Sequence, residues 1–234
     1  MAFKEFQLDG SKLIKIYKRK GNRSMRLSVA ANGEVRLSIP PWLPYDAGLK
    51  FAESRASWIQ AQQTARPNLK LKPGQAIGKA HHLLLIPHQA LSKPVAKIKA
   101  NQILVNYPEA MDLEDELVQK AAHKACLRAL RVQSEQLLPH RLRNLAAVHG
   151  FDYKSVKIKQ LKSRWGSCDH QQNIVLNLFL MQLPWDCIDY VLLHELVHTK
   201  VLKHGPAFWT ELERVLPTAK SLRKIIRSHQ PALY

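Results

Sequence analysis

The sequence predicts an α+β protein in which a β-rich N-terminal region precedes a region built around one buried helix. Three features support this class. Apolar and polar residues alternate as in strands over residues 12–40, proline and glycine separate short strand-like runs from 64 to 108, and residues 187–202 form a helix that is apolar on nearly every side. We therefore expect a basic, β-rich region with one helix at 1–110 and a second domain at 111–234.

The N-terminal region is predicted to contain several short strands and one helix. A hairpin turn is expected at Asn32 and Gly33, because both residues accept positive φ angles at low cost. Residues 45–63 are expected to form one amphipathic helix, since apolar residues recur at helical spacing from Leu49 to Ile59. The strands are expected at 12–17, 26–29, 35–39, 82–86 and 95–106.

The C-terminal region is predicted to begin with a long helix. Asp112 is expected to cap it, and Pro139 is expected to kink or interrupt it, because proline lacks the N–H group that a continuing helix needs. A second helical piece is expected to end at Gly150, a residue type that favours the left-handed conformation after a helix. Asp186 is expected to cap the apolar helix at 187–202. Strands are expected at 156–161, 164–167 and 174–180.

Length and composition indicate a globular protein that needs no disulfides. Hydrophobic residues make up 46% and charged residues 23% of the 234 residues, which excludes disordered and fibrous classes. Three cysteines, an odd number, favour a reducing compartment, and all three are expected to be free. The N-terminus has no signal-peptide core and no apolar run approaches a membrane span, so we expect a cytoplasmic protein that does not enter a membrane.

The chain is strongly basic. Lys and Arg number 36 against 18 Asp and Glu, a net charge of +18, and residues 1–110 hold 18 of the basic and 6 of the acidic side chains. A field of this sign attracts polyanions, so nucleotides and nucleic acid are candidate partners, although a basic surface kept for solubility accounts for the charge equally well. One basic run contains no acid; it consists of Lys154, Lys157, Lys159, Lys162 and Arg164.

Three polar residues interrupt the apolar helix. His194 and His198 are four residues apart and therefore lie on one face, where both imidazoles reach a single ion. Glu195 lies about 100° round the helix, where it reaches water at that ion without necessarily binding the ion itself. If they were only core residues, the three would be buried polar groups, and each would cost on the order of several kcal/mol if left unpaired. The helix is therefore predicted to carry a metal site.

A catalytic zinc site usually has three protein ligands and one position open to water. His204 is the natural third ligand, although in an unbroken helix it would point about 240° away from His198. The pair Gly205-Pro206 favours an earlier end of the helix, because proline disfavours α conformation in the residue before it and is well placed to open the next helix. Rival third ligands are Glu211, Glu213 and, more weakly, Cys168.

The segment from 163 to 209 carries several further motifs. They are Arg164-Trp165-Gly166-Ser167-Cys168, Ile174 to Asn177, Ile188-Asp189-Tyr190, the His-Glu-Leu-Val-His run, and His204 followed by Phe208-Trp209. Together they resemble the YgjP-like proteins, relatives of the SprT-like and WLM zincin metallopeptidases. The resemblance implies a minimal zincin-like metallopeptidase domain at 111–234, one Zn²⁺ held by His194, His198 and His204, and Glu195 as catalytic acid/base.

Four further residues are candidates for a substrate cleft. Arg164 and Trp165 would line it if their strand runs beside the helix, and Tyr190 lies one turn before His194 on the metal-facing side. Asn177 ends a second candidate strand. Either 165–168 or 174–177 is expected to offer an edge that pairs with an extended peptide. The plain alternatives are a core aromatic for Tyr190 and an interior strand for either segment.

The predicted function is zinc-dependent hydrolysis, with a metallopeptidase favoured. Water activated by zinc attacks a carbonyl group, Glu195 acts as general base, and protein or peptide is the substrate. One alternative is hydrolysis of a nucleotide phosphoanhydride, as in a nucleoside triphosphate pyrophosphatase, which the charge of +18 favours. Another is a basic nucleic-acid-associated protein with structural zinc. Glu195 argues against the latter, since a closed structural site needs a fourth ligand and no general base.

Overall fold

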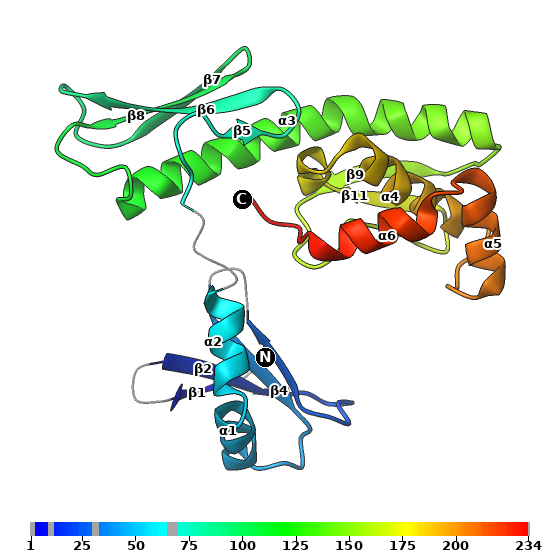
Figure 1. The fold of residues 1–234 in the computed structure, drawn as a ribbon, viewed down its shortest axis with the longest axis horizontal. Helices are drawn as coiled ribbons and strands as arrows, with labels where there is room; N and C mark the ends of the chain where they lie inside the picture. Colours follow the sequence, from blue (N-terminus) through cyan, green and yellow to red (C-terminus); the bar gives the residue numbers. More distant parts are fainter. Residues whose placement is uncertain (1–2, 9–11, 30–32, 65–69, 234) are drawn as a thin grey trace. The chain divides into compact units, whose positions relative to one another are not determined.

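The computed structural model describes residues 3–8, 12–29, 33–64 and 70–233. The chain forms two compact units, Met1–Leu69 and Lys70–Tyr234 (Figure 1). The boundary expected at residue 110 falls inside the second unit, between a strand and a long helix whose apolar residues share one core. The turn expected at 31–33 lies largely outside the described residues.

The first unit is a four-stranded sheet covered on one face by two helices. Its core contains residues from both layers, including Ile14, Leu37 and Ile59. The strands expected at 12–17, 26–29 and 35–39 are confirmed, and a further strand precedes them. The order is β1-β2-β4-β3, with β2 and β4 parallel and the other neighbours antiparallel. The strands are β1 (Phe3–Leu8), β2 (Lys12–Lys18), β3 (Arg26–Val29) and β4 (Val35–Ile39).

The single helix predicted over 45–63 is wrong, because two helices occupy this stretch. They are α1 (Tyr45–Glu53) and α2 (Ala56–Thr64). At the break the hydroxyl of Ser54 donates to the carbonyl of Phe51 at 2.8 Å. A serine side chain that bonds nearby backbone in this way competes with the helical ladder, which accounts for the break.

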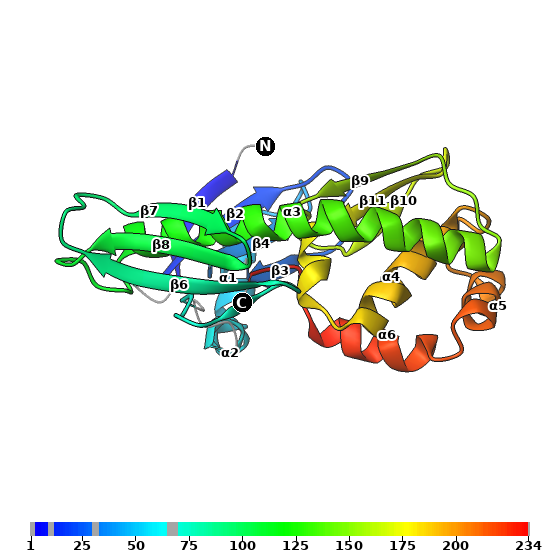
Figure 2. The ribbon, with the colours of Figure 1, turned by 90° about the horizontal axis from the view of Figure 1, so that it is seen from above.

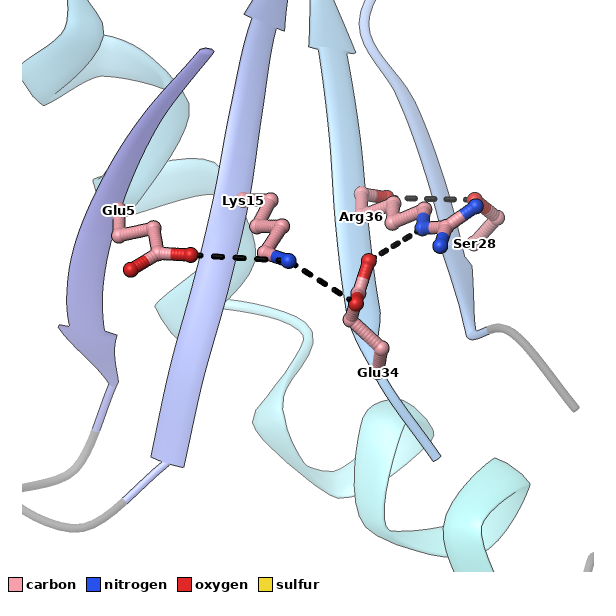
Figure 3. A network of polar contacts seen from close by, with 5 residues as sticks. All are labelled: Glu5, Lys15, Ser28, Glu34 and Arg36. Carbon is pink, nitrogen blue, oxygen red and sulfur yellow. Dashed lines mark hydrogen bonds and ion pairs between the residues drawn. The ribbon is translucent and has the colours of Figure 1, made fainter. Parts of the chain in front are cut away.

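The sheet face opposite the helices carries a row of charged side chains (Figure 3). Lys15 alternates with buried residues along β2 and so points away from the core. Its Nζ lies 3.1 Å from Oε2 of Glu34 and 3.6 Å from Oε1 of Glu5, while Arg36 donates to Glu34. Basic side chains of this face are therefore paired with acids across neighbouring strands.

The second unit is organised along α3 (Glu116–His149), a helix of 34 residues. A four-stranded sheet lies against its N-terminal half, and the remaining elements gather at its C-terminal half (Figures 1 and 2). The sheet order is β5-β6-β8-β7, with β6 and β8 parallel. Its strands are β5 (Ala76–Ile77), β6 (His81–His88), β7 (Val95–Lys99) and β8 (Gln102–Pro108).

The start and the continuity of α3 differ from the sequence prediction. Asp115, not Asp112, caps the helix, and its Oδ1 accepts the N–H of Leu117 at 2.8 Å. The helix runs through Pro139, so the expected interruption is wrong. Residues on both sides of this proline are fully buried, and their packing offsets the lost backbone hydrogen bond. Gly150 ends the helix in the left-handed conformation, with φ of 68°, as predicted.

A three-stranded sheet and three helices complete the second unit. The sheet order is β10-β11-β9, with β10 antiparallel and β9 parallel to β11. Its strands are β9 (Ser155–Lys159), β10 (Gly166–Cys168) and β11 (Asn173–Asn177). A 3-10 turn, η1 (Leu178–Gln182), then leads to α4 (Trp185–His198), α5 (Pro206–Val215) and α6 (Ala219–Ser228). The predicted α+β class is confirmed.

The predicted buried helix corresponds to α4, most of whose residues are buried. It contacts α3, α5, α6 and β10 and so lies inside the second unit. Asp186 belongs to its first turn rather than capping it, because the cap position is Pro184. Within the described residues, none of the helices has the length and apolar character needed to cross a membrane.

Candidate metal centre

The first turn of α4 is anchored on α3 by an arginine. Arg141 donates to both carboxylate oxygens of Asp189, with Nη2 and Oδ2 2.6 Å apart. Its guanidinium also lies 4.7 Å from the ring centre of Trp185. A bidentate pair of this kind fixes orientation as well as position. The partners are 48 residues apart, so no local sequence pattern pointed to this pair.

The helix α4 ends at His198, which allows the chain to return towards it. Beyond His198, the N–H groups of Thr199 and Lys200 bond carbonyls only three residues back. The next helix begins at Pro206, as predicted. The returning chain brings Nε2 of His204 to 2.9 Å from Nε2 of His194 and 3.2 Å from Nε2 of His198. All three ligand atoms lie within 4.8 Å of one another.

This donor set fits a zinc ion. Nitrogen ligands about 2.0–2.1 Å from a tetrahedral zinc lie roughly 3.3 Å from each other, close to the spacing found. The nitrogens cannot satisfy one another, because the single Nε2 proton of a neutral His204 can serve only one neighbour. Nδ1 of His198 lies 3.1 Å from the carbonyl of Val201. A proton on that Nδ1 leaves the Nε2 lone pair for a metal.

Burial keeps the α4 histidines neutral, the form that binds a metal. Burial lowers the pKa of His194 to about 3, and Coulombic repulsion from His198, His204 and Arg223 acts in the same direction. Burial also lowers the pKa of His198, although the hydrogen bond with the Val201 carbonyl acts to raise it. Nδ1 of His194 is buried and has no hydrogen-bond partner among the described residues.

Glu195 is a buried carboxyl group beside this cluster. Its side chain is only 5% exposed, and within the part of the chain that is described no hydrogen bond or ion pair holds its carboxyl group. Burial raises its pKa to about 8, and the charge of Arg164 offsets this only in part. These values describe the metal-free protein, since a bound dication favours the carboxylate form.

Gly166 of β10 provides the space that Glu195 occupies. A Cβ atom on this glycine would lie 2.7 Å from Oε1 of Glu195 and 2.8 Å from its Cγ. Such contacts are too short to exist, so any other residue would displace the glutamate. The close approach explains why glycine stands in the middle of the Trp-Gly-Ser-Cys motif.

The strand β10 lies at the edge of its sheet, next to α4. The carbonyl of Trp165 accepts from Asn177, and the N–H of Asp169 donates to Asn173, so these residues face β11. Because the direction alternates along a strand, the N–H and C=O groups of Gly166 and Cys168 face the free side. No other strand of the described chain pairs with that side.

The four cleft candidates lie in different environments. The Tyr190 ring is buried, 5.8 Å from the ring of His194. Trp165 is half-buried against the core, and Arg164 is exposed. Asn177 is fully buried: its amide nitrogen donates to the carbonyls of Leu161 and Arg164 at 2.8 Å, and its oxygen accepts from Phe179. Asn177 thus supports the backbone before β10 rather than presenting a free group.

The rival metal ligands are all outside the cluster. Glu211 accepts two hydrogen bonds from Arg214 at 2.9 Å, and Glu213 pairs with Lys220 at 3.0 Å. Cys168 is free, and burial raises the pKa of its thiol to about 11, so it is not a ready thiolate ligand. The other two cysteines are also free, as expected.

Aromatic rings that the sequence analysis did not assign to the site surround the histidines. The Phe208 ring lies 4.8 Å from His194, 4.5 Å from His198 and 4.7 Å from His204. Trp209 lies farther out, and Arg223 of α6 stacks on it. The Phe208-Trp209 motif after His204 was a signal for these rings, whereas nothing in the sequence pointed to Arg223.

A histidine cluster that lies beside a buried glutamate and an open strand edge is typical of metallopeptidases. The comparison with known families supports the same class. Residues 23–229 match the family described as "YgjP-like, metallopeptidase domain". Because this match covers most of the chain, the protein belongs to the YgjP-like family, and the resemblance found in the sequence is confirmed. No curated protein matches the chain.

Two solved structures are similar to part of the chain. The metallopeptidase zymogen abylysin of Pyrococcus abyssi is 26% identical, with a TM-score of 0.37, over 39% of this chain and 93% of its own. The metallopeptidase zymogen jannalysin of Methanocaldococcus jannaschii is 22% identical, with a TM-score of 0.33, over 37% of this chain and 91% of its own.

Proposed function

We propose that this protein is a zinc-dependent peptidase in which His194, His198 and His204 hold one Zn²⁺ and Glu195 moves the proton. The observation that carries the proposal is the convergence of three Nε2 atoms beside a buried carboxyl group without a partner among the described residues. Unpaired buried polar groups destabilise a fold, so an arrangement of this kind needs a reason other than stability.

The roles of the residues follow from their positions. Zinc in such a site lowers the pKa of water towards 7 and polarises a carbonyl group. Glu195 accepts a proton from the attacking water as the new C–O bond forms. It then donates this proton to the amine nitrogen as the C–N bond breaks, which regenerates the carboxylate. Gly166 keeps the carboxyl group where this transfer takes place.

The free edge of β10 supports a peptide as the substrate. The outward N–H and C=O groups of Gly166 and Cys168 match those of an extended chain. Pairing with main-chain groups gives affinity that does not depend on the substrate's sequence. The same strand approaches Glu195 at Gly166, so a peptide paired there would pass beside the proposed base.

The lysines of β9 do not favour a nucleotide substrate. Lys157 and Lys159 are exposed on β9, which lies on the far side of β11 from β10. With strands about 4.8 Å apart, these lysines belong to the opposite sheet edge. Structural zinc is also disfavoured, because no fourth His, Cys, Asp or Glu joins the cluster in the described chain.

The test is cleavage of a broad peptide library and of an unfolded protein by the zinc-loaded full chain. We expect Glu195→Gln to lower kcat/KM by about 10²–10⁴-fold while zinc content, measured by mass spectrometry, stays the same. Glu213→Gln is the matched control, since it removes one carboxylate from α5 that pairs with Lys220. This control should retain wild-type activity.

Phosphate release from nucleoside triphosphates is measured in parallel. Release that needs Glu195, without peptide cleavage, would replace the peptidase by the phosphoanhydride hydrolase. A zinc-loaded protein that hydrolyses neither class of bond would overturn the proposal. Peptide cleavage that is equally fast in Glu195→Gln would remove the assigned role of the glutamate but keep a peptidase.

A further inference from the structure

Two arginines lie on α6, the helix that packs against α4 and its two histidines. Arg223 and Arg227 are one helical turn apart, and both are exposed. Among the described residues neither forms an ion pair, whereas Lys220 on the same helix pairs with Glu213 at 3.0 Å. The positive charge on this part of α6 is therefore available to a ligand.

Arg223 is held at the site by an aromatic ring. Its Cζ lies 4.3 Å from the ring centre of Trp209. The Trp209 ring lies in turn 6.0 Å from the ring of His204 and 6.4 Å from that of His194. The guanidinium is thus one ring away from two of the three histidines. A guanidinium that lies over an aromatic ring still has N–H groups that point away from the ring and can meet a ligand.

Tyr190 belongs to α4, the helix against which α6 packs. Its ring is 5.8 Å from the ring of His194, and its hydroxyl makes no hydrogen bond with any residue that the structure describes. Burial raises the pKa of Tyr190, and the charges of Arg223 and Arg227 act in the opposite direction.

We infer that Arg223, with the Tyr190 hydroxyl, binds a carboxylate of the substrate next to the scissile bond. A guanidinium and a phenol both donate hydrogen bonds, and the two oxygens of a carboxylate match the arginine fork and can accept from both groups. The carboxylate belongs to a free C-terminus or to an Asp or Glu side chain. The second unit has 24 basic and 13 acidic residues, which favours an acidic substrate in the same sense.

This inference rests on the proposed peptidase function, but its test does not need turnover. The probes are three short peptides: acetyl-Ala-Ala-Ala-amide, the same peptide with a free C-terminus, and acetyl-Ala-Glu-Ala-amide. Their affinities for zinc-loaded Glu195→Gln protein are measured by calorimetry at low salt. We expect at least one carboxylate peptide to bind about tenfold more tightly than the neutral one, the size of a charge-assisted hydrogen bond.

Adding Arg223→Gln should abolish this preference without changing the affinity for the neutral peptide. Lys224→Gln is the matched control, because it removes the same charge from the neighbouring position of α6 and should leave the preference intact. If only the free C-terminus is preferred, the site selects chain ends; if the Glu peptide is also preferred, it accepts side chains.

Three results would overturn the inference. They are equal affinity for neutral and charged peptides, a preference that survives Arg223→Gln, and an equal loss in Lys224→Gln, which would indicate the general field of the basic protein. Failure of the peptidase proposal is a separate result, because it concerns cleavage by the protein with Glu195 intact. Where that protein cuts peptides, the same preference should appear in kcat/KM.

Discussion

Two clusters of polar side chains lie in the second unit, and they differ in how their hydrogen-bonding groups are satisfied. In the first, Gln133 of α3 donates to the carbonyl of Ile77 at 3.0 Å and bonds Nδ1 of His81 at 2.7 Å. Its oxygen accepts from the N–H of Lys79 at 2.6 Å. His81 also bonds the backbone of Ala100. In the second, Nδ1 of His198 meets the carbonyl of Val201, but the three Nε2 atoms meet only one another among the described residues.

The difference separates a structural cluster from a functional one. Burial lowers the pKa of His81 just as it lowers that of His194, so burial and pKa do not distinguish them. What differs is whether the polar groups have hydrogen-bond partners. Around Gln133 each donor meets an acceptor, whereas at the candidate metal centre the Nε2 lone pairs point at one another. Groups left unsatisfied in this way are expected where a ligand completes the set.

The largest effect is expected from breaking the second cluster at His204. This residue is the only one of the three histidines outside α4. With two ligands left, zinc content should fall from about one per chain to well below half, and peptide cleavage should be lost, since a catalytic site requires three ligands. The measurement is metal analysis of dialysed wild-type and His204→Ala protein, with circular dichroism to check the fold.

His170→Ala is the control for this substitution, because His170 is an exposed histidine outside the cluster. It should retain the full amount of zinc. Retention of zinc in His204→Ala as well would mean that the third ligand is another residue, and the three-histidine assignment would fall.

The sequence predicted the second cluster because its ligands are local. His194 and His198 are separated by one helical turn, and Pro206 marked the point where the chain leaves the helix. The first cluster could not be predicted in the same way. Gln133 and His81 are 52 residues apart, and neither belongs to a motif. Only the packing of β6 on α3 brings them together.

The fold was predictable to a similar degree. Alternation located most strands, yet it gave neither their parallel pairing nor the division at residue 69, since both depend on contacts between distant segments. Local rules failed where tertiary packing prevailed, as at Pro139, which α3 passes without a break. At the site, Arg223 was missed because its position depends on how α6 packs on α4 and α5.

A smaller effect on activity is expected from Gly166→Ala. This substitution tests the second cluster by displacing the carboxyl group of Glu195 while leaving the three histidines in place. The added Cβ would lie within 2.8 Å of two Glu195 atoms, so the side chain must shift. A displacement of about 1 Å in a catalytic group costs on the order of 10²-fold in rate. We expect kcat to fall by about that factor with zinc content unchanged.

Gly205→Ala is the matched control, because Gly205 adjoins His204 but a Cβ there would have no heavy atom within 4 Å. Its backbone is extended, with φ of −94°, so alanine fits. Wild-type kcat is expected for this variant. A loss of activity equal to that of Gly166→Ala would show that any change near the metal centre is harmful, and the steric role of Gly166 would be unsupported.

The smallest effect on activity is expected from breaking the first cluster, with Gln133→Leu. Leucine removes the side-chain hydrogen bonds to the Ile77 carbonyl, the Lys79 N–H and Nδ1 of His81. Unsatisfied buried groups cost about 1–3 kcal/mol each, and partial relaxation should hold the total near 2–4 kcal/mol of unfolding free energy, measured by urea denaturation. Gln136→Leu, on the exposed side of α3, should change stability by less than about 0.5 kcal/mol.

Below the unfolding transition Gln133→Leu should keep wild-type zinc content and kcat. A variant that stays folded but loses zinc would show that the two clusters are coupled, and the separation between structure and function drawn from their hydrogen bonds would not hold.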